Sequence, residues 1–239
     1  MIIHEEICVG CGRCQPFCPA RAILFENLRS KVDQEKCFEC GTCLRVKICP
    51  VDAIEEHPGV YDHPRSLRKY FSDPVAVHKL TGIAGRGTQE SKSNDVTKRV
   101  GPGEVGIAIE VGRPTLGMTI EDIQKVTRAL AKAGITEIES LNPIQSMISD
   151  PATGDLKPEL FGERVLSAII ELGVKRERLS RVLRMVKEVA KEVDSVITLD
   201  VFMTLEPKLK IPQEVIDIIE EEGFSWRPNA KINLGLGRA

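Results

Sequence analysis

The eight cysteines of this 239-residue chain lie between positions 8 and 49, and their spacing is that of metal ligands. The two sets are Cys8, Cys11, Cys14 and Cys18, then Cys37, Cys40, Cys43 and Cys49. In each set three cysteines stand at intervals of three, and the fourth is followed by proline. Such a loop can place three soft thiolates on three corners of a four-iron, four-sulfide cube. The pattern therefore predicts two [4Fe-4S] clusters and single-electron transfer.

Two other uses of cysteine fit this pattern less well. A structural zinc site takes four ligands, usually as two cysteine pairs, whereas this chain offers two triplets with a trailing Cys-Pro. A disulfide framework is typical of small secreted domains, and no hydrophobic signal segment precedes Cys8. We therefore expect the cysteines to bind iron.

The two cysteine sets belong to an internal repeat. The segment from Cys18 to Ile23 (CPARAI) parallels the segment from Cys49 to Ile54 (CPVDAI). Residues 1–57 resemble a bacterial-type two-cluster ferredoxin, in which each motif supplies its last cysteine to the other cluster. The resemblance implies one cluster on Cys8, Cys11, Cys14 and Cys49, and a second on Cys37, Cys40, Cys43 and Cys18. Five residues, Leu44 to Ile48, precede the last cysteine where the common pattern has three, so one loop is longer but no ligand is lost.

Three glycines lie inside the cysteine loops: Gly10, Gly12 and Gly41. Without a Cβ atom they allow backbone N–H groups to approach the cluster sulfides closely. We expect them to be cofactor-binding positions.

The composition limits where the chain works. The formal net charge is −2, and no apolar run approaches the roughly 20 residues that a membrane-spanning helix needs. Thiolate-bound clusters and the lack of a signal segment favour a reducing compartment, so a cytoplasmic location is expected.

Residues 58–103 form a connector that is rich in Pro, Gly, Ser and basic residues. Short helices are expected near Ser66–Phe71 and Pro74–Leu80 within an otherwise irregular segment. Two interpretations stay open: a solvated tether, or a basic arm that docks on a partner or on the acidic N-terminal segment. A third, a phosphate-binding loop at Gly82, Gly85 and Gly87, lacks the Lys-Ser/Thr of a P-loop.

Residues 104–239 contain no cysteine and show regular hydrophobic periodicity. Strands are predicted over Val105–Val111, Ile135–Leu141, Val165–Leu172 and Ser195–Thr204, with further strand expected near Ile144–Ile148 and Lys231–Leu236. Helices are predicted over Ile120–Ala133, Arg176–Val193 and Pro212–Glu222. The order predicts an α+β fold, a ferredoxin-like βαββαβ plait.

No catalytic motif is evident in residues 104–239, so no catalytic residue is assigned and enzymatic activity stays open. Asp200 interrupts an apolar strand and is expected to point outward. Gly85–Thr97 and Val105–Pro114 resemble ferredoxin-fused proteins of strictly anaerobic archaea, methanogens among them.

The leading hypothesis is an electron-transfer subunit or dedicated donor of a larger anaerobic redox complex. Its expected partner is a multi-subunit oxidoreductase, with no nucleic-acid partner. The alternatives are a ferredoxin-domain reductase or biosynthetic enzyme whose C-terminal domain binds substrate, and a regulatory protein that senses a ligand or redox state.

Overall fold

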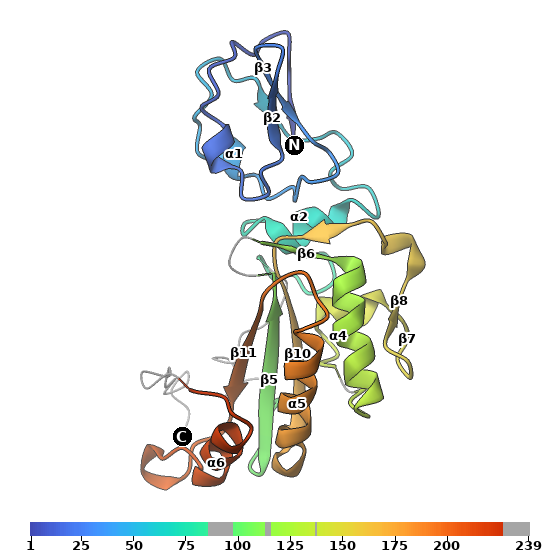
Figure 1. Cartoon of the computed structure of the whole chain (residues 1–239), viewed down its shortest axis with the longest axis vertical. Helices are drawn as coiled ribbons and strands as arrows, with labels where there is room; N and C mark the ends of the chain where they lie inside the picture. Colours follow the sequence, from blue (N-terminus) through green and yellow to red (C-terminus); the bar gives the residue numbers. More distant parts are fainter. Residues whose placement is uncertain (86–97, 113–115, 137, 227–239) are drawn as a thin grey trace.

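A computed structural model describes residues 1–85, 98–112, 116–136 and 138–226, which combine short helices with antiparallel sheet. Figure 1 shows residues 1–57, called the N-terminal module below, at one end, and the described residues from 104 to 226, called the C-terminal domain, at the other. Helix α2 (Ser66–Ser72) lies between the two. The expected mixture of helix and sheet is present.

Two short strand pairs organise the N-terminal module. β1 (Ile2–Ile3) pairs antiparallel with β4 (Ile54–Glu55), and β2 (Ile23–Glu26) pairs with β3 (Arg29–Val32). β2 and β3 form a hairpin whose two-residue turn has positive φ at both positions, as a type I′ turn requires. The module also contains the helices η1 (Gln15–Phe17) and α1 (Thr42–Arg45). Its small core includes cysteines as well as aliphatic side chains.

Helix α2 corresponds to the connector helix expected near Ser66–Phe71. It is not solvated, because Arg68, Lys69 and Phe71 are all buried. The helix expected near Pro74–Leu80 does not form; those residues make turns and an isolated bridge between Val77 and Ala84. Proline disfavours helical geometry in the residue before it, and the chain is extended at Asp73. The connector is therefore irregular only in part; the expectation for Gly87 lies outside the described residues.

The C-terminal domain is built on a three-stranded antiparallel sheet in the order β10-β5-β11. β5 (Glu104–Val111) lies between β10 (Ala168–Lys175) and β11 (Ile197–Phe202). Helices α4 (Ile120–Lys132) and α5 (Leu179–Val189) pack on the sheet and share its apolar core (Figure 1). α6 (Gln213–Glu221) packs beside α5. α4 begins where its sequence predicts, because the Thr119 hydroxyl accepts a hydrogen bond from the Asp122 N–H at 3.2 Å.

Short elements complete the domain. Two pairs of strands are β6 (Met118–Thr119) with β9 (Arg164–Val165), and β7 (Ile148–Asp150) with β8 (Asp155–Leu156). The 3₁₀ helices are η3 (Pro143–Met147), η4 (Pro158–Leu160), η5 (Arg176–Arg178) and η6 (Pro207–Leu209).

The strand predicted over Ile135–Leu141 does not form in the described residues. A single bridge joins Ile138 to Leu172 of β10, and the Glu139 N–H donates to the Glu171 carbonyl at 2.9 Å. The predicted strand near Ile144–Ile148 is largely η3, since proline opens that helix and the Asn142 side chain caps it. The place expected for a second strand, beside β10, therefore holds a nearly irregular segment. The edge strand expected at Lys231–Leu236 lies outside the described residues.

Candidate metal centres

Cys8, Cys11, Cys14 and Cys49 line one cavity. The first three come from the loop that follows β1, and Cys49 precedes β4. Because β1 and β4 pair along their length, they bring the end of the second motif beside the start of the first. This cavity, called the first centre below, has aliphatic walls that include Ile3 and Ile54.

Cys37, Cys40, Cys43 and Cys18 line a second cavity. Cys18 precedes β2, and the other three follow β3. The pairing of Ile23 with Val32 in the β2–β3 hairpin brings the two motifs together here. Each cavity thus takes three cysteines from one motif and one from the other. We call this cavity the second centre.

The sulfurs of both centres accept hydrogen bonds from the backbone. The N–H groups of Ala22 and Ala53 each donate at 3.2 Å, to the Sγ atoms of Cys18 and Cys49. These alanines are equivalent in the internal repeat, so the same contact recurs at both centres. The Gly10 and Ser30 N–H groups both donate to Cys8 Sγ at 3.5 Å, and the Glu39 N–H to Cys37 Sγ at 3.5 Å. Such donors stabilise ligating thiolates.

The three loop glycines do not occupy equivalent places. All have positive φ, from 66° to 68°. Gly12 lines the first centre, while Gly10 packs so closely that a Cβ atom would come within 2.1 Å of the Leu28 carbonyl oxygen. Gly41 caps α1 and lines neither cavity.

Electrostatics links the thiols of each centre. Burial, and then the neighbouring charges of Cys40, Cys37 and Cys18, raise the pKa of Cys43 to about 12. Burial also raises the pKa of Cys14 and Cys37, whereas the N–H donors at Cys8 outweigh its burial and lower its pKa. In the metal-free chain the most buried thiols therefore keep their protons at neutral pH, and iron must displace them.

The donor set fits cubane clusters better than single ions. In the described part of the chain, no three His, Cys, Asp or Glu side chains converge as the ligands of one metal ion would. Thiolates on a cubane bind separate corner irons and stand farther apart. Soft sulfur ligands, apolar walls and backbone donors at each cavity all fit a [4Fe-4S] cluster.

The two centres differ in exposure. Cys11 at the first centre is exposed, while Cys37, Cys40 and Cys43 at the second are buried. Phe38 lines the second centre and packs against Gly117 of the C-terminal domain, where a Cβ atom would meet its ring at 2.2 Å. The second centre therefore lies beside the C-terminal domain.

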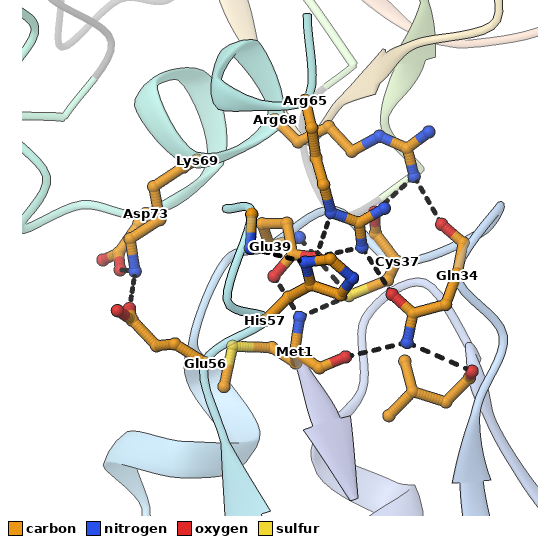
Figure 2. A network of polar contacts seen from close by, with 12 residues as sticks. Met1, Gln34, Cys37, Glu39, Glu56, His57, Arg65, Arg68, Lys69 and Asp73 are labelled. Carbon is orange, nitrogen blue, oxygen red and sulfur yellow. Dashed lines mark hydrogen bonds and ion pairs between the residues drawn. The ribbon is translucent and has the colours of Figure 1, made fainter. Parts of the chain in front are cut away.

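Basic side chains of α2 and the residue before it join the module to the domain (Figure 2). Arg68 donates to the backbone carbonyls of Gln34 at 2.8 Å, Glu35 at 3.1 Å and Cys37 at 2.9 Å. Its other donors reach Glu163 and the Gly162 carbonyl of the C-terminal domain. The guanidinium thus contacts both parts of the chain from a buried position.

Two further cations of this segment pair with acidic groups of the module. Arg65 bonds to the fully buried Glu39, which also accepts from the Met1 amino group, and Lys69 bonds to Glu56. Burial alone would raise the pKa of Glu39, but the Met1 amino group and Arg65 hold it below its usual value. Docking of basic connector residues on the acidic N-terminal segment was one of the two open interpretations; the individual partners and their burial could not be predicted from the cluster of basic residues alone.

Asp200 on β11 is exposed, as predicted. Residues 86–97, on which part of the archaeal resemblance rests, lie outside the described residues.

Comparisons with known proteins concern the N-terminal module. Residues 1–50 match the 4Fe-4S dicluster domain family. One relative, from the ion-translocating oxidoreductase complex of Methanosarcina acetivorans, is 50% identical over 53 residues, which is 22% of this chain and 19% of that protein. The pyruvate synthase subunit PorD of Thermotoga maritima is 38% identical over 58 residues, 24% of this chain and 57% of PorD. The chain thus spans about a fifth and somewhat over half of the lengths of these two relatives.

A shorter relative is matched over most of its length. The ferredoxin-like protein in the vnf region of Azotobacter vinelandii is 35% identical over 55 residues, which is 22% of this chain and 85% of that protein. No solved structure matches the chain.

Proposed function

We propose that this chain, which belongs through its first fifty residues to the 4Fe-4S dicluster ferredoxin family, is an electron-transfer subunit or dedicated donor of a larger redox complex. It carries two [4Fe-4S] clusters. The observation that carries the proposal is the sorting of the eight cysteines into two similar cavities, each with three thiols from one motif and one from the other.

Cluster ligation in this proposal follows the cavities. Cys8, Cys11, Cys14 and Cys49 hold the first cluster, and Cys37, Cys40, Cys43 and Cys18 hold the second. A bound cluster takes up and releases one electron. The chain's own part is to hold the cube, to offset added negative charge with backbone N–H donors and to keep water away with aliphatic walls. The exposed side of the first centre is where an external redox protein would exchange electrons.

The names of the relatives support a multi-subunit oxidoreductase as the partner. One relative is a subunit of an ion-translocating oxidoreductase complex, and another is a subunit of pyruvate synthase. Among the described helices, none is long and apolar enough to cross a membrane. Thiolate-bound clusters require reducing surroundings, which supports a cytoplasmic site of action.

The C-terminal domain is proposed as the anchoring part of the protein. The chain is divided in this proposal into the N-terminal module (residues 1–57), the connector (58–103) and the C-terminal domain (104–239). Helix α2 of the connector forms the interface between the module and the domain. The sheet order β10-β5-β11 and the Ile138–Leu172 bridge support a βαββαβ plait whose second strand is rudimentary. This arrangement would present the module at one end of the molecule (Figure 1).

Iron analysis of paired cysteine variants tests the ligation. The unmodified chain, prepared without oxygen, should hold about eight irons and become paramagnetic on reduction with dithionite. If Cys8 and Cys49 serve one cluster, Cys8→Ser/Cys49→Ser loses that cluster and keeps about four irons. Cys37→Ser/Cys49→Ser removes a ligand from each cluster and should keep almost none. Equal iron contents in the two double variants would contradict the sorting, and zinc in place of iron would contradict the proposed function.

A further inference from the structure

The side chain of Ser30 is a buried hydroxyl inside the first centre. Ser30 lies on β3, is only 1% exposed, and lines the cavity formed by Cys8, Cys11, Cys14 and Cys49. Its Oγ atom has no hydrogen-bond partner within the described residues. Because unsatisfied buried hydroxyls are costly, such a group in a native fold needs a partner that the protein atoms do not supply.

The hydroxyl is placed beside the sulfurs. The Ser30 N–H donates to Cys8 Sγ at 3.5 Å. The Ser30 side chain belongs to the same cavity wall as Cys8 and Cys14, and its Oγ atom forms a hydrogen bond with neither sulfur. The buried hydroxyl therefore stands beside the ligands of the first centre with its donor unused.

The internal repeat shows that this donor belongs to one centre alone. Ser30 stands seven residues before Cys37, and the equivalent residue, seven before Cys8, is Met1. Met1 lines the second centre, whose lining residues include no hydroxyl. The Thr42 hydroxyl, on helix α1, lies 3.3 Å from Cys40 Sγ and is hydrogen-bonded to it. Unlike the Ser30 hydroxyl, it therefore already has a partner.

We propose that the Ser30 hydroxyl donates a hydrogen bond to a sulfur of the first [4Fe-4S] cluster and thereby raises the reduction potential of that cluster. Reduction adds negative charge to the cluster, so a hydrogen bond to its sulfur is stronger in the reduced state. The proposal rests on the proposed function, since it requires the cluster. It makes Ser30 a residue that tunes the exposed, partner-facing centre without binding iron.

A redox titration followed by paramagnetic resonance tests this on the full chain with both clusters. In Ser30→Ala we expect one of the two midpoint potentials to fall, with about a tenfold loss in the equilibrium constant for reduction, or about 59 mV for a one-electron couple. Ser30→Thr keeps the hydroxyl and should restore the original value. Thr42→Val is the matched control: it removes a hydroxyl beside the second centre and should move the other midpoint.

Three results would overturn the inference. The first is full iron content in Ser30→Ala with both midpoints unchanged; the second is a fall of the same size in Ser30→Thr. The third is a result in which Ser30→Ala and Thr42→Val shift the same one of the two midpoint potentials. If Ser30→Ala fails to hold the cluster, Ser30→Val replaces it, because it matches the shape of Ser30→Thr without the hydroxyl and adds no iron ligand; its midpoint must also fall. An unmodified chain without about eight irons contradicts the proposed function instead.

Discussion

Arg68→Met should separate the N-terminal module from the C-terminal domain. The guanidinium is about nine-tenths buried and donates to three carbonyls of the module while pairing with Glu163 of the domain. Methionine fills a similar space but offers no donor. The substitution therefore leaves a largely buried carboxylate and three carbonyls without their common partner.

The size of the effect follows from this burial. Removing one member of a buried ion pair costs about 3–5 kcal/mol, because the remaining charge is left uncompensated. The carbonyls nearer the surface can bond to water instead, which favours the lower end of that range. The free energy of unfolding falls by about 2 kcal/mol per molar urea, so the urea midpoint for loss of cluster absorption should fall by roughly 1.5–2.5 M.

The assay is anaerobic urea unfolding followed by two signals. Cluster absorption reports the module, and far-ultraviolet circular dichroism reports mainly the C-terminal domain. We expect one transition in the unmodified chain and, in Arg68→Met, an earlier loss of cluster absorption. Arg128→Met is the control, since its pair with Asp155 lies on the surface with 58% and 35% of the two side chains exposed, and such pairs contribute about 0–1 kcal/mol.

Equal midpoints for Arg68→Met and Arg128→Met would refute the reasoning. So would a shift in Arg68→Met that leaves the two signals coincident, since the guanidinium would then stabilise the chain without joining its two parts.

Two further predictions concern pH and backbone conformation. Burial lowers the pKa of His78, so the unfolded chain binds its proton more tightly and stability should fall as pH drops below about 6.5. His78→Phe, which keeps the packing against two aromatic rings, should show a smaller loss of urea midpoint between about pH 7 and about pH 5.5; an identical pH dependence would count against a buried, neutral imidazole. Gly10→Ala should reduce iron to about four, because its Cβ would clash with the Leu28 carbonyl oxygen at 2.1 Å. Gly12→Ala, also at positive φ but with its nearest contact at 3.5 Å, should bear only about 1–2 kcal/mol of strain and keep about eight irons; iron retained equally by both variants would exclude the clash.

Local patterns account for what could be predicted. Cysteine spacing predicted the two clusters because ligands within one short loop are already close together. The start of α4 was predictable for a similar reason: the Thr119 side chain caps a helix that begins at the next residue. The prediction of a strand over Ile135–Leu141 was wrong. Alternating apolar residues favour a strand, but they do not determine whether a neighbouring strand can pair with it along its full length.

The iron chemistry and the main helices could be predicted because they depend on residues close together in the chain. Which charges are buried became evident only from the folded chain. Arg68 belongs to a basic segment for which a solvated tether and a docking arm were both open, and its burial follows only once Glu163, ninety-five residues later, is brought against it. Ser30 likewise looks like an ordinary polar strand residue until the fold buries it in the wall of the first centre. Burial depends on contacts between distant segments, and spacing along a chain carries no record of them.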